Sequence, residues 1–408
     1  MDGISLAPIG LLLLVACLIA MISRKLGLPY SVGLVAAGLL IAAIPDAPRF
    51  TLSRDLIFNI LLPPLVFEAA LQLPWPDFRR ELPVTSTLAL VGVALAALLV
   101  ACGMHYGLHW SWIGASLFGV LIAATDPVAV IAAFKEMKAD KRLCMLVESE
   151  SLLNDGVAAV GFAVLVAVAA GASPSVASVV PAFLWTLLGG ALVGGIVSGL
   201  ILLLAGRTND HLVEITLTTL AAYGSFLIAE RLHASGVLAS LTAGLVIGNL
   251  GSMGAISDTG RPHVLAAWEF FAFVANSFVF LLIGMQLVGA PMSRLGWVTA
   301  AIAILLVLAG RAVAVYPLAN LFRPTKLRVP FGVQNVLFWG GLRGALGLAL
   351  ALTVPPSVPE RESIILSAFA VVAFSIFVQG LTMPWLVERL GLTRRAGAKR
   401  VAAVRDRP

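Results

Sequence analysis

Apolar segments long enough to cross a lipid bilayer follow one another along almost the whole chain of 408 residues. A transmembrane helix needs about 20 predominantly apolar residues, and only helices and closed barrels satisfy their backbone hydrogen bonds in lipid. The runs are continuous rather than alternating, which favours helices over barrel strands. Charged residues make up only 12% of the chain, whereas soluble domains contain about 25%. We therefore expect an all-α polytopic membrane protein with about thirteen transmembrane helices, at residues 6–23, 28–44, 55–73, 84–105, 111–134, 142–171, 179–206, 211–231, 236–252, 264–288, 295–320, 331–353 and 363–388.

The first apolar run is expected to remain in the protein as a helix. The stretch Leu14–Cys17 resembles a lipoprotein cleavage box, but Met1–Gly10 contains no Lys or Arg. The basic region of a signal peptide is therefore missing.

The distribution of basic residues predicts the orientation in the membrane. Of the 27 Lys and Arg residues, 20 would lie on one side and 5 on the other, and the remaining two, Arg311 and Arg343, fall inside apolar segments. Basic residues concentrate on the cytoplasmic side. We therefore expect a multi-pass protein of the cell inner (plasma) membrane, with its N-terminus outside and its C-terminus in the cytoplasm. The net charge of +6 is then explained by topology, and no nucleic-acid partner is expected.

The chain is interpreted as one transmembrane domain, residues 1–390, followed by a short basic cytoplasmic tail, residues 391–408. Thirteen helices can divide into two inverted repeats of six, at about 6–171 and 211–388, with a linker helix at about 179–206. The fifth helix would then correspond to the twelfth. Thr125–Pro127 interrupts the fifth and Gly340–Gly344 interrupts the twelfth. Paired interruptions in two halves are typical of a transporter's binding site.

The first interruption has a chemical consequence. Pro127 removes a backbone donor and clashes with the preceding turn, so the helix is expected to unwind at Thr125 and Asp126. Freed carbonyl groups can coordinate a cation, and Asp126 suits the positive N-terminal end of a half-helix. The alternative is a simple proline kink that Asp126 caps.

The segment 142–171 places ionisable side chains at membrane depth, where they indicate an ion or proton pathway by default. Asp155 shares a helix face with Ser151, Asn154 lies beside that face, and Glu150 is turned away from it. Carboxylate, hydroxyl and amide oxygens are the ligands that a hard cation prefers. The alternative is a buried Asp155 that is satisfied by hydrogen bonds.

Three further charged residues lie within apolar segments. Glu68 is alone in its segment and is interpreted as a cation ligand or proton site, or as part of the access path. Arg343 lies among glycines and must pair or face water; its candidate partners are Glu150 and the carbonyl ends of the break. Arg311 also needs a partner, which the sequence does not identify.

Five motifs, in this order, resemble the NhaP/NHE branch of the sodium–proton antiporters, within the monovalent cation:proton antiporter superfamily. They are Pro63–Glu68, Thr125–Val130, Glu150–Asp155, Asn276–Gly284 and Gly340–Ala345. The resemblance covers essentially the whole membrane domain. The long cytoplasmic tail of animal members is missing, so the sequence resembles a prokaryotic member.

The resemblance implies an NhaA-like antiporter fold and a homodimer, in which a six-helix core moves in an elevator-like way. It implies that Asp155 binds the cation and the proton in turn. Ser151, Glu68 and the Thr125 region would complete the cation shell. Asn154 would steady the crossing of the broken helices, and Glu150 would form a structural ion pair with Arg343.

These expectations converge on a secondary active antiporter, not an enzyme, that exchanges Na⁺ or Li⁺ for H⁺ within membrane lipid and needs no cofactor. One carboxylate that holds either ion, but not both, couples the two by competition. The neutral Asn154 beside Asp155 favours electroneutral one-for-one exchange. A K⁺/H⁺ antiporter would use the same residues. A cation channel would need a filter-like repeat, and an ATP-driven pump would need a glycine-rich phosphate-binding motif that the sequence lacks.

Overall fold

The computed structural model describes residues 6–26, 29–44, 55–171, 176–251, 256–289 and 296–393. The regular elements of this part are helices, apart from one isolated bridge between Ala139 and Thr393. The part of the predicted tail beyond Thr393 lies outside the described residues. The same holds for three of the basic residues on which the predicted orientation rests, Arg49, Arg54 and Arg294.

Seven continuous helical stretches in the described ranges are long and apolar enough to cross a membrane. They are formed by α4, η2 and α5 in succession (Trp75–Thr87, Leu88–Gly92, Val93–Leu108), α8 (Lys141–Ala169), α9 (Val176–Ala205), α10 (His211–Arg231), α12 (Arg261–Gly289), α14 (Trp297–Leu321), and α17, η4 and α18 in succession (Arg361–Phe374, Ser375–Gly380, Leu381–Arg389). The remaining helices are α1 (Leu6–Leu26), α2 (Tyr30–Ala42), η1 with α3 (Leu56–Leu61, Leu62–Gln72), α6 (Trp112–Leu121), α7 (Val128–Met137), α11 (Gly236–Leu250), α15 (Phe331–Trp339) and α16 (Ala345–Leu352). The predicted class, a helical membrane protein, is confirmed.

The stretch that contains α4 begins at Trp75, nine residues before the predicted start of this helix at residue 84. Pro83 lies inside α4 and does not end it. The hydroxyl groups of Ser86 and Thr87 donate to the carbonyls of Leu82 and Pro83, at 2.5 and 2.7 Å. Such hydroxyls help to satisfy the backbone around an intrahelical proline, so the helix continues through it.

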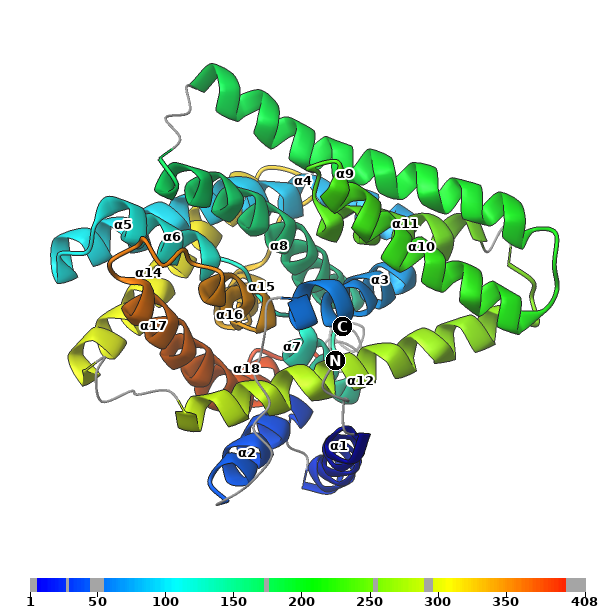
Figure 1. Ribbon diagram of the computed structural model, residues 1–408, viewed down its shortest axis with the longest axis horizontal. Coiled ribbons are helices and arrows are strands. Elements are labelled where there is room, and N and C mark those ends of the chain that lie inside the picture. The colour runs from blue at the N-terminus through cyan, green and yellow to red at the C-terminus, as the bar shows by residue number, and fades with distance from the viewer. Residues whose placement is uncertain are drawn as a thin grey trace, which may run out of the picture.

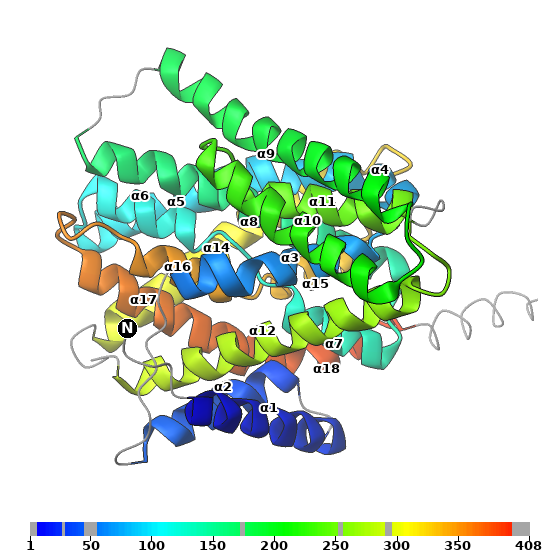
Figure 2. The same ribbon diagram turned by 45° about the vertical axis from the view of Figure 1, so that its right-hand side comes forward.

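The helices pack in two groups. The α12 group comprises α1 to α3 and α9 to α12, and the α14 group comprises α4 to α8 and α14 to α18. Figures 1 and 2 show α9 at one edge of the molecule, and α1 and α2 at the opposite edge, beyond α12. The long helix α8 passes between other helices toward the middle of the bundle.

Two glycines bring α2 and α12 into close contact. A Cβ atom added at Gly38 would lie 3.0 Å from the Cα of Gly284, and one added at Gly284 would lie 3.0 Å from the Cα of Gly38. Small residues let membrane helices approach in this way. Gly284 ends the motif that begins at Asn276, so this contact helps to fix the position of Asn276 beside the α14 group.

Both predicted interruptions are present. Helix α6 ends at Leu121 and α7 begins at Val128, and α15 ends at Trp339 before α16 begins at Ala345. Two broken helices therefore face the centre of the molecule with four free helix ends.

Candidate ion-binding site

The two interruptions touch each other through their backbones and their charged side chains. The N–H of Asp126 donates to the carbonyl of Leu342 at 2.7 Å. The guanidinium of Arg343 donates to the carbonyls of Ala123 and Ala124, at 2.8 and 3.1 Å. Each break thus satisfies backbone groups that the other break exposes, which a membrane interior requires.

The carboxylate of Asp126 accepts hydrogen bonds at the N-terminal ends of two half-helices, α7 and α16. It accepts from the N–H of Val128 at 2.9 Å, at the start of α7. It also accepts from the N–H of Ala345, at the start of α16. A carboxylate satisfies the free donors of a helix N-terminus and is attracted by its partial positive charge. Asp126 therefore lies at the starts of both α7 and α16, whereas Arg343 lies at free carbonyl groups of the first break.

The predicted ion pair between Glu150 and Arg343 is wrong. Glu150 pairs with Arg311, whose two terminal nitrogens donate to its two oxygens at 2.8 and 2.9 Å. Arg311 also donates twice to the carbonyl of Leu337, in the last turns of α15. Arg343 instead donates to two carbonyls at the first break, Ala123 and Ala124. The pair of Glu150 and Arg311 joins α8, α14 and α15 inside the α14 group.

Asn154 connects this ion pair to the first break. Its amide nitrogen donates to the hydroxyl of Thr125 at 2.6 Å and to Glu150 at 3.0 Å. Its oxygen accepts from the N–H of Thr125 at 3.2 Å. The hydroxyl of Ser151 lies 2.9 Å from that of Thr125. All four side chains are buried, so the network holds the unwound backbone at Thr125 in one place.

Asp155 faces a small cavity of about 60 Å³ beside the crossing. One water molecule needs about 10–15 Å³ of such space, so the cavity has room for an ion with a few waters. Thr125, Asp126 and Asn276 are the other polar residues that line it. No other described residue forms a hydrogen bond or ion pair with the carboxylate of Asp155. The cavity thus offers two carboxylates, a hydroxyl and an amide, a set of ligands that suits a hard cation.

Glu68 is not among the residues that line this cavity. Its neighbours Leu65 and Ala69 on α3 are, while Glu68 itself accepts a hydrogen bond from Gln72. Gln72 lines a second, polar cavity of about 570 Å³. Glu68 therefore lies on the turn of α3 between the two cavities.

The polar cavity approaches the site along α8. Glu148 lines it, seven residues before Asp155, or about 10 Å along the helix axis. Asp77 and Glu81 on α4 contribute two more carboxylates to its wall. A cation that reaches Glu148 from this cavity would be within two helical turns of Asp155.

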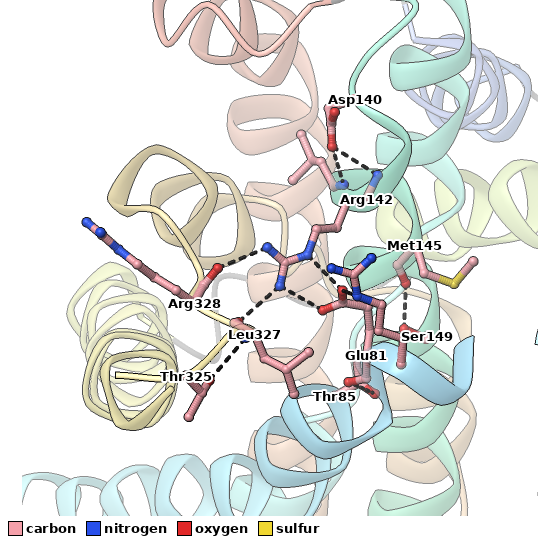
Figure 3. A network of polar contacts seen from close by, with 11 residues as sticks. Glu81, Thr85, Asp140, Arg142, Met145, Ser149, Thr325, Leu327 and Arg328 are labelled. Carbon is pink, nitrogen blue, oxygen red and sulfur yellow. Dashed lines mark hydrogen bonds and ion pairs between the residues drawn. The ribbon is translucent and has the colours of Figure 1, made fainter. Parts of the chain in front are cut away.

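Two features of the site were missed in the sequence. Asn276 was noted only as part of a motif, although a lone amide in an apolar segment was a usable signal. The buried Glu81 binds Arg142 through both of its oxygens, at 2.8 and 2.9 Å (Figure 3). Arg142 also donates to the carbonyls of Leu327 and Arg328 in the α14–α15 connection. Sequence spacing gave no signal for a contact between positions so far apart.

An integral membrane protein in which two interrupted helices meet beside a carboxylate-lined cavity has the architecture of secondary transporters. The chain belongs to the sodium/hydrogen exchanger family, whose transmembrane model matches residues 11–389. This confirms the resemblance noted in the five motifs.

The chain is similar to individual members of this family along most of its length. It is 41% identical to the Na⁺/H⁺ antiporter ApNhaP of Aphanothece halophytica over 368 residues, which cover 90% of this chain and 70% of that protein. It is 34% identical to the Na⁺/H⁺ antiporter NhaP of Pseudomonas aeruginosa, over 82% of this chain and 81% of that one. The solved structure of the sodium proton antiporter MjNhaP1 from Methanocaldococcus jannaschii at pH 8 superposes with a TM-score of 0.76 at 18% identity, over 93% of this chain and 97% of that chain. That likeness shows a shared fold.

Proposed function

We propose that the protein is a secondary active antiporter that exchanges Na⁺ or Li⁺ for H⁺ across the membrane. The observation that carries the proposal is the Asp155 carboxylate, which faces a small cavity at the crossing of two broken helices. The Na⁺/H⁺ antiport named for the relatives of this chain supports the same activity.

Competition at Asp155 would couple the two ions. The carboxylate binds one Na⁺ or one proton, and either ion excludes the other. Thr125 and Asp126 would contribute oxygens from the first break, and Asn276 would contribute one from α12. Ser151 would orient the hydroxyl of Thr125, to which it is hydrogen-bonded. Glu68 would act at the boundary between the polar cavity and the site rather than as a fixed ligand.

The charge network around the site would stay unchanged during exchange. Glu150 and Arg311 neutralise each other. Asn154 is hydrogen-bonded to both Glu150 and Thr125 and would hold Thr125 in place relative to this ion pair. With the neutral Asn154 beside Asp155, only one carboxylate would change its occupant in each half-cycle. This favours exchange of one cation for one proton, which avoids the coupling to membrane potential of about 2.3 kcal/mol per charge and 100 mV.

The larger architecture is part of the same proposal. The interrupted helices α6–α7 and α15–α16 would correspond in two inverted repeats of six membrane crossings, with α9 as the linker, thirteen crossings in all. The N-terminus would face outward and the C-terminus the cytoplasm. Two copies would associate through the α12 group, and the α14 group would carry the bound ion across in an elevator-like motion.

The test is proton flux in proteoliposomes, with Na⁺, Li⁺ and K⁺ added in turn, with and without a clamped membrane potential. Na⁺ and Li⁺ should drive proton release and K⁺ should not, and clamping the potential should leave the rate unchanged. Flux driven equally by K⁺ would favour the K⁺/H⁺ alternative.

Asp155→Asn should abolish exchange while the purified protein keeps its melting temperature and its single peak in size-exclusion chromatography. The amide cannot release a proton or supply a negative charge to Na⁺. Asp258→Asn, at an exposed loop position, is the matched control and should exchange normally. Exchange by the Asp155→Asn protein at a substantial fraction of the wild-type rate would refute the proposal.

A further inference from the structure

A large apolar groove lies between the α12 group and the α14 group, away from the candidate ion site. Its volume is about 580 Å³. Helices α4 and α8 form one wall, with Leu82 among the lining residues, and α9 and α11 form the other, with Leu188, Ala191 and Leu245. Ser86, one of its few polar lining residues, donates its hydroxyl to the carbonyl of Leu82. The groove therefore offers water little to bind.

The groove is open to its surroundings at membrane depth. Leu188 on α9 is 66% exposed and Leu90 on η2 is 41% exposed, and both line it. In a bilayer these side chains face hydrocarbon. Lipid tails are as apolar as leucine, so an acyl chain can fill the groove without losing any polar contact.

One end of the groove carries an interfacial aromatic residue and a cation. Trp75, at the start of α4, lines the groove and is 45% exposed. The spacing of 75, 79, 82 and 86 places Arg79 on the same helix face as the lining residues Trp75, Leu82 and Ser86. Arg79 is exposed, and it forms no hydrogen bond or ion pair with another described residue. Its neighbour Arg80 is turned by about 100° around α4 and lines the polar cavity.

We propose that this groove binds one anionic phospholipid, with an acyl chain between α4 and α9 and its phosphate on Arg79. A guanidinium binds phosphate through paired hydrogen bonds, and tryptophan favours the level of the lipid headgroups. The site thus places an apolar slot, an interfacial ring and a cation without a partner among the described residues in the same order as the acyl chain, interface and phosphate of a phospholipid. The inference is independent of which ions the protein exchanges.

The headgroup contact is tested by lipid binding to the full-length protein, purified and delipidated in detergent, using native mass spectrometry. The probes are palmitoyl-oleoyl phosphatidylglycerol and the phosphatidylcholine with the same chains. Wild type should bind phosphatidylglycerol more tightly. Arg79→Gln should weaken phosphatidylglycerol binding roughly fivefold, the factor that corresponds to about 1 kcal/mol for one basic residue, and should leave phosphatidylcholine binding unchanged. Arg80→Gln is the matched control and should behave like wild type.

The chain contact is tested by filling the groove. Ala191→Phe should reduce the binding of both lipids at least tenfold, whereas Leu192→Phe, at the adjacent exposed position that does not line the groove, should have no effect. The melting temperature of the lipid-free variants checks their folding. Ala191→Leu replaces Ala191→Phe if the larger side chain prevents folding.

Three outcomes would overturn the proposal. The first is equal phosphatidylglycerol binding by wild type and Arg79→Gln, or an equal loss with Arg80→Gln. The second is binding of sn-glycerol 3-phosphate as tight as that of the lipid, which would indicate a site for a free anion. The third is a change of oligomeric mass in Ala191→Phe with unchanged lipid binding, which would make the groove a contact between copies.

Discussion

At the scale of single residues, the charge of Glu150 is balanced inside the protein rather than by water. Its side chain is 1% exposed and that of Arg311 is 8% exposed. The guanidinium meets both carboxylate oxygens and also the carbonyl of Leu337. Removal of one partner therefore leaves the other charge buried with no counter-charge at hydrogen-bonding distance.

We expect Glu150→Ala and Arg311→Ala each to lower the free energy of unfolding by about 3–5 kcal/mol, the usual cost of breaking a buried pair. The double variant should be less damaging than the sum of the two, because neither charge is then stranded. The melting temperatures of the four proteins in detergent complete the double-mutant cycle. Arg323→Ala, at an exposed position, controls for the loss of an arginine. Additive effects of Glu150→Ala and Arg311→Ala would contradict a direct pair.

The sequence identified most of these residues but not all of their contacts. Asp126, Asp155 and Arg343 were recognised because a charged side chain at membrane depth needs a reason to be there. The partner of Glu150 was not predictable, because Arg311 and Arg343 both lie within apolar segments and Arg311 is 161 positions away in the chain. Helix periodicity relates only neighbours within one helix.

At the scale of elements, the crossing of the broken helices leaves no space at Gly344. A Cβ atom added there would collide with the side chain of Asp126, which serves the starts of both α7 and α16. Because the obstacle is a side chain held by two backbone donors, it cannot move aside without freeing helix ends.

Gly344→Ala should therefore destabilise the protein by about 1–3 kcal/mol, as overpacking usually does, and should slow exchange by at least tenfold. The measurements are the melting temperature in detergent and Na⁺-driven proton flux in proteoliposomes. Gly332→Ala, on the other half of the same broken helix, is the control, because its added Cβ would lie 4.0 Å from the nearest atom. Equal behaviour of the two variants would show that the crossing tolerates the extra atom.

The positions of both breaks were predictable because proline and clustered glycine act locally on the backbone. The start of α4 at Trp75 was not, since Pro74–Asp77 has the turn and breaker residues that are typical of a connector. Tertiary contacts stabilise the charged residues near the start of this helix. Glu81 is buried against Arg142, and Arg142 also donates a hydrogen bond to the α14–α15 connection (Figure 3). Local composition does not reveal such support.

At the scale of the whole molecule, competition for one carboxylate has a distinct signature in pH. We expect the apparent KM for Na⁺ to rise about tenfold for each unit by which the pH falls, as long as protons occupy most sites. At higher pH the apparent KM should level off, because occupancy by a competitor follows mass action. The maximal rate at saturating Na⁺ should change much less, because enough Na⁺ displaces the proton.

Na⁺-dependent flux measured between about pH 5 and 9 checks this expectation, a range that covers the titration of carboxylates buried in proteins. A separate pH sensor would instead lower the maximal rate as the pH falls and leave the apparent KM for Na⁺ unchanged. An apparent KM for Na⁺ that does not depend on pH, combined with a maximal rate that falls strongly at low pH, would exclude competition at a single shared carboxylate.

Hydropathy predicted a helical membrane protein, and seven helical stretches in the described residues are long and apolar enough to cross a membrane. Hydropathy could not predict how the helices group, because each apolar helix is compatible with many apolar neighbours. The contact of α2 with α12 depends on Gly38 and Gly284, and the joining of α8 to α14 depends on one ion pair. These contacts are decided by close fit and by single charges, which average hydropathy does not record.

The crossing also has a consequence for biosynthesis. The carbonyl of Ala123 is satisfied by a side chain 220 positions later in the chain. A ribosome that adds about 5–20 residues per second needs roughly 10–45 s to reach that point. During that time the first broken helix has already been made, but its free ends lack the partners that the finished protein supplies. Until Arg343 emerges, water, lipid headgroups or the insertion machinery must satisfy those backbone groups, so the first half of this protein depends on help from outside until its second half has been made.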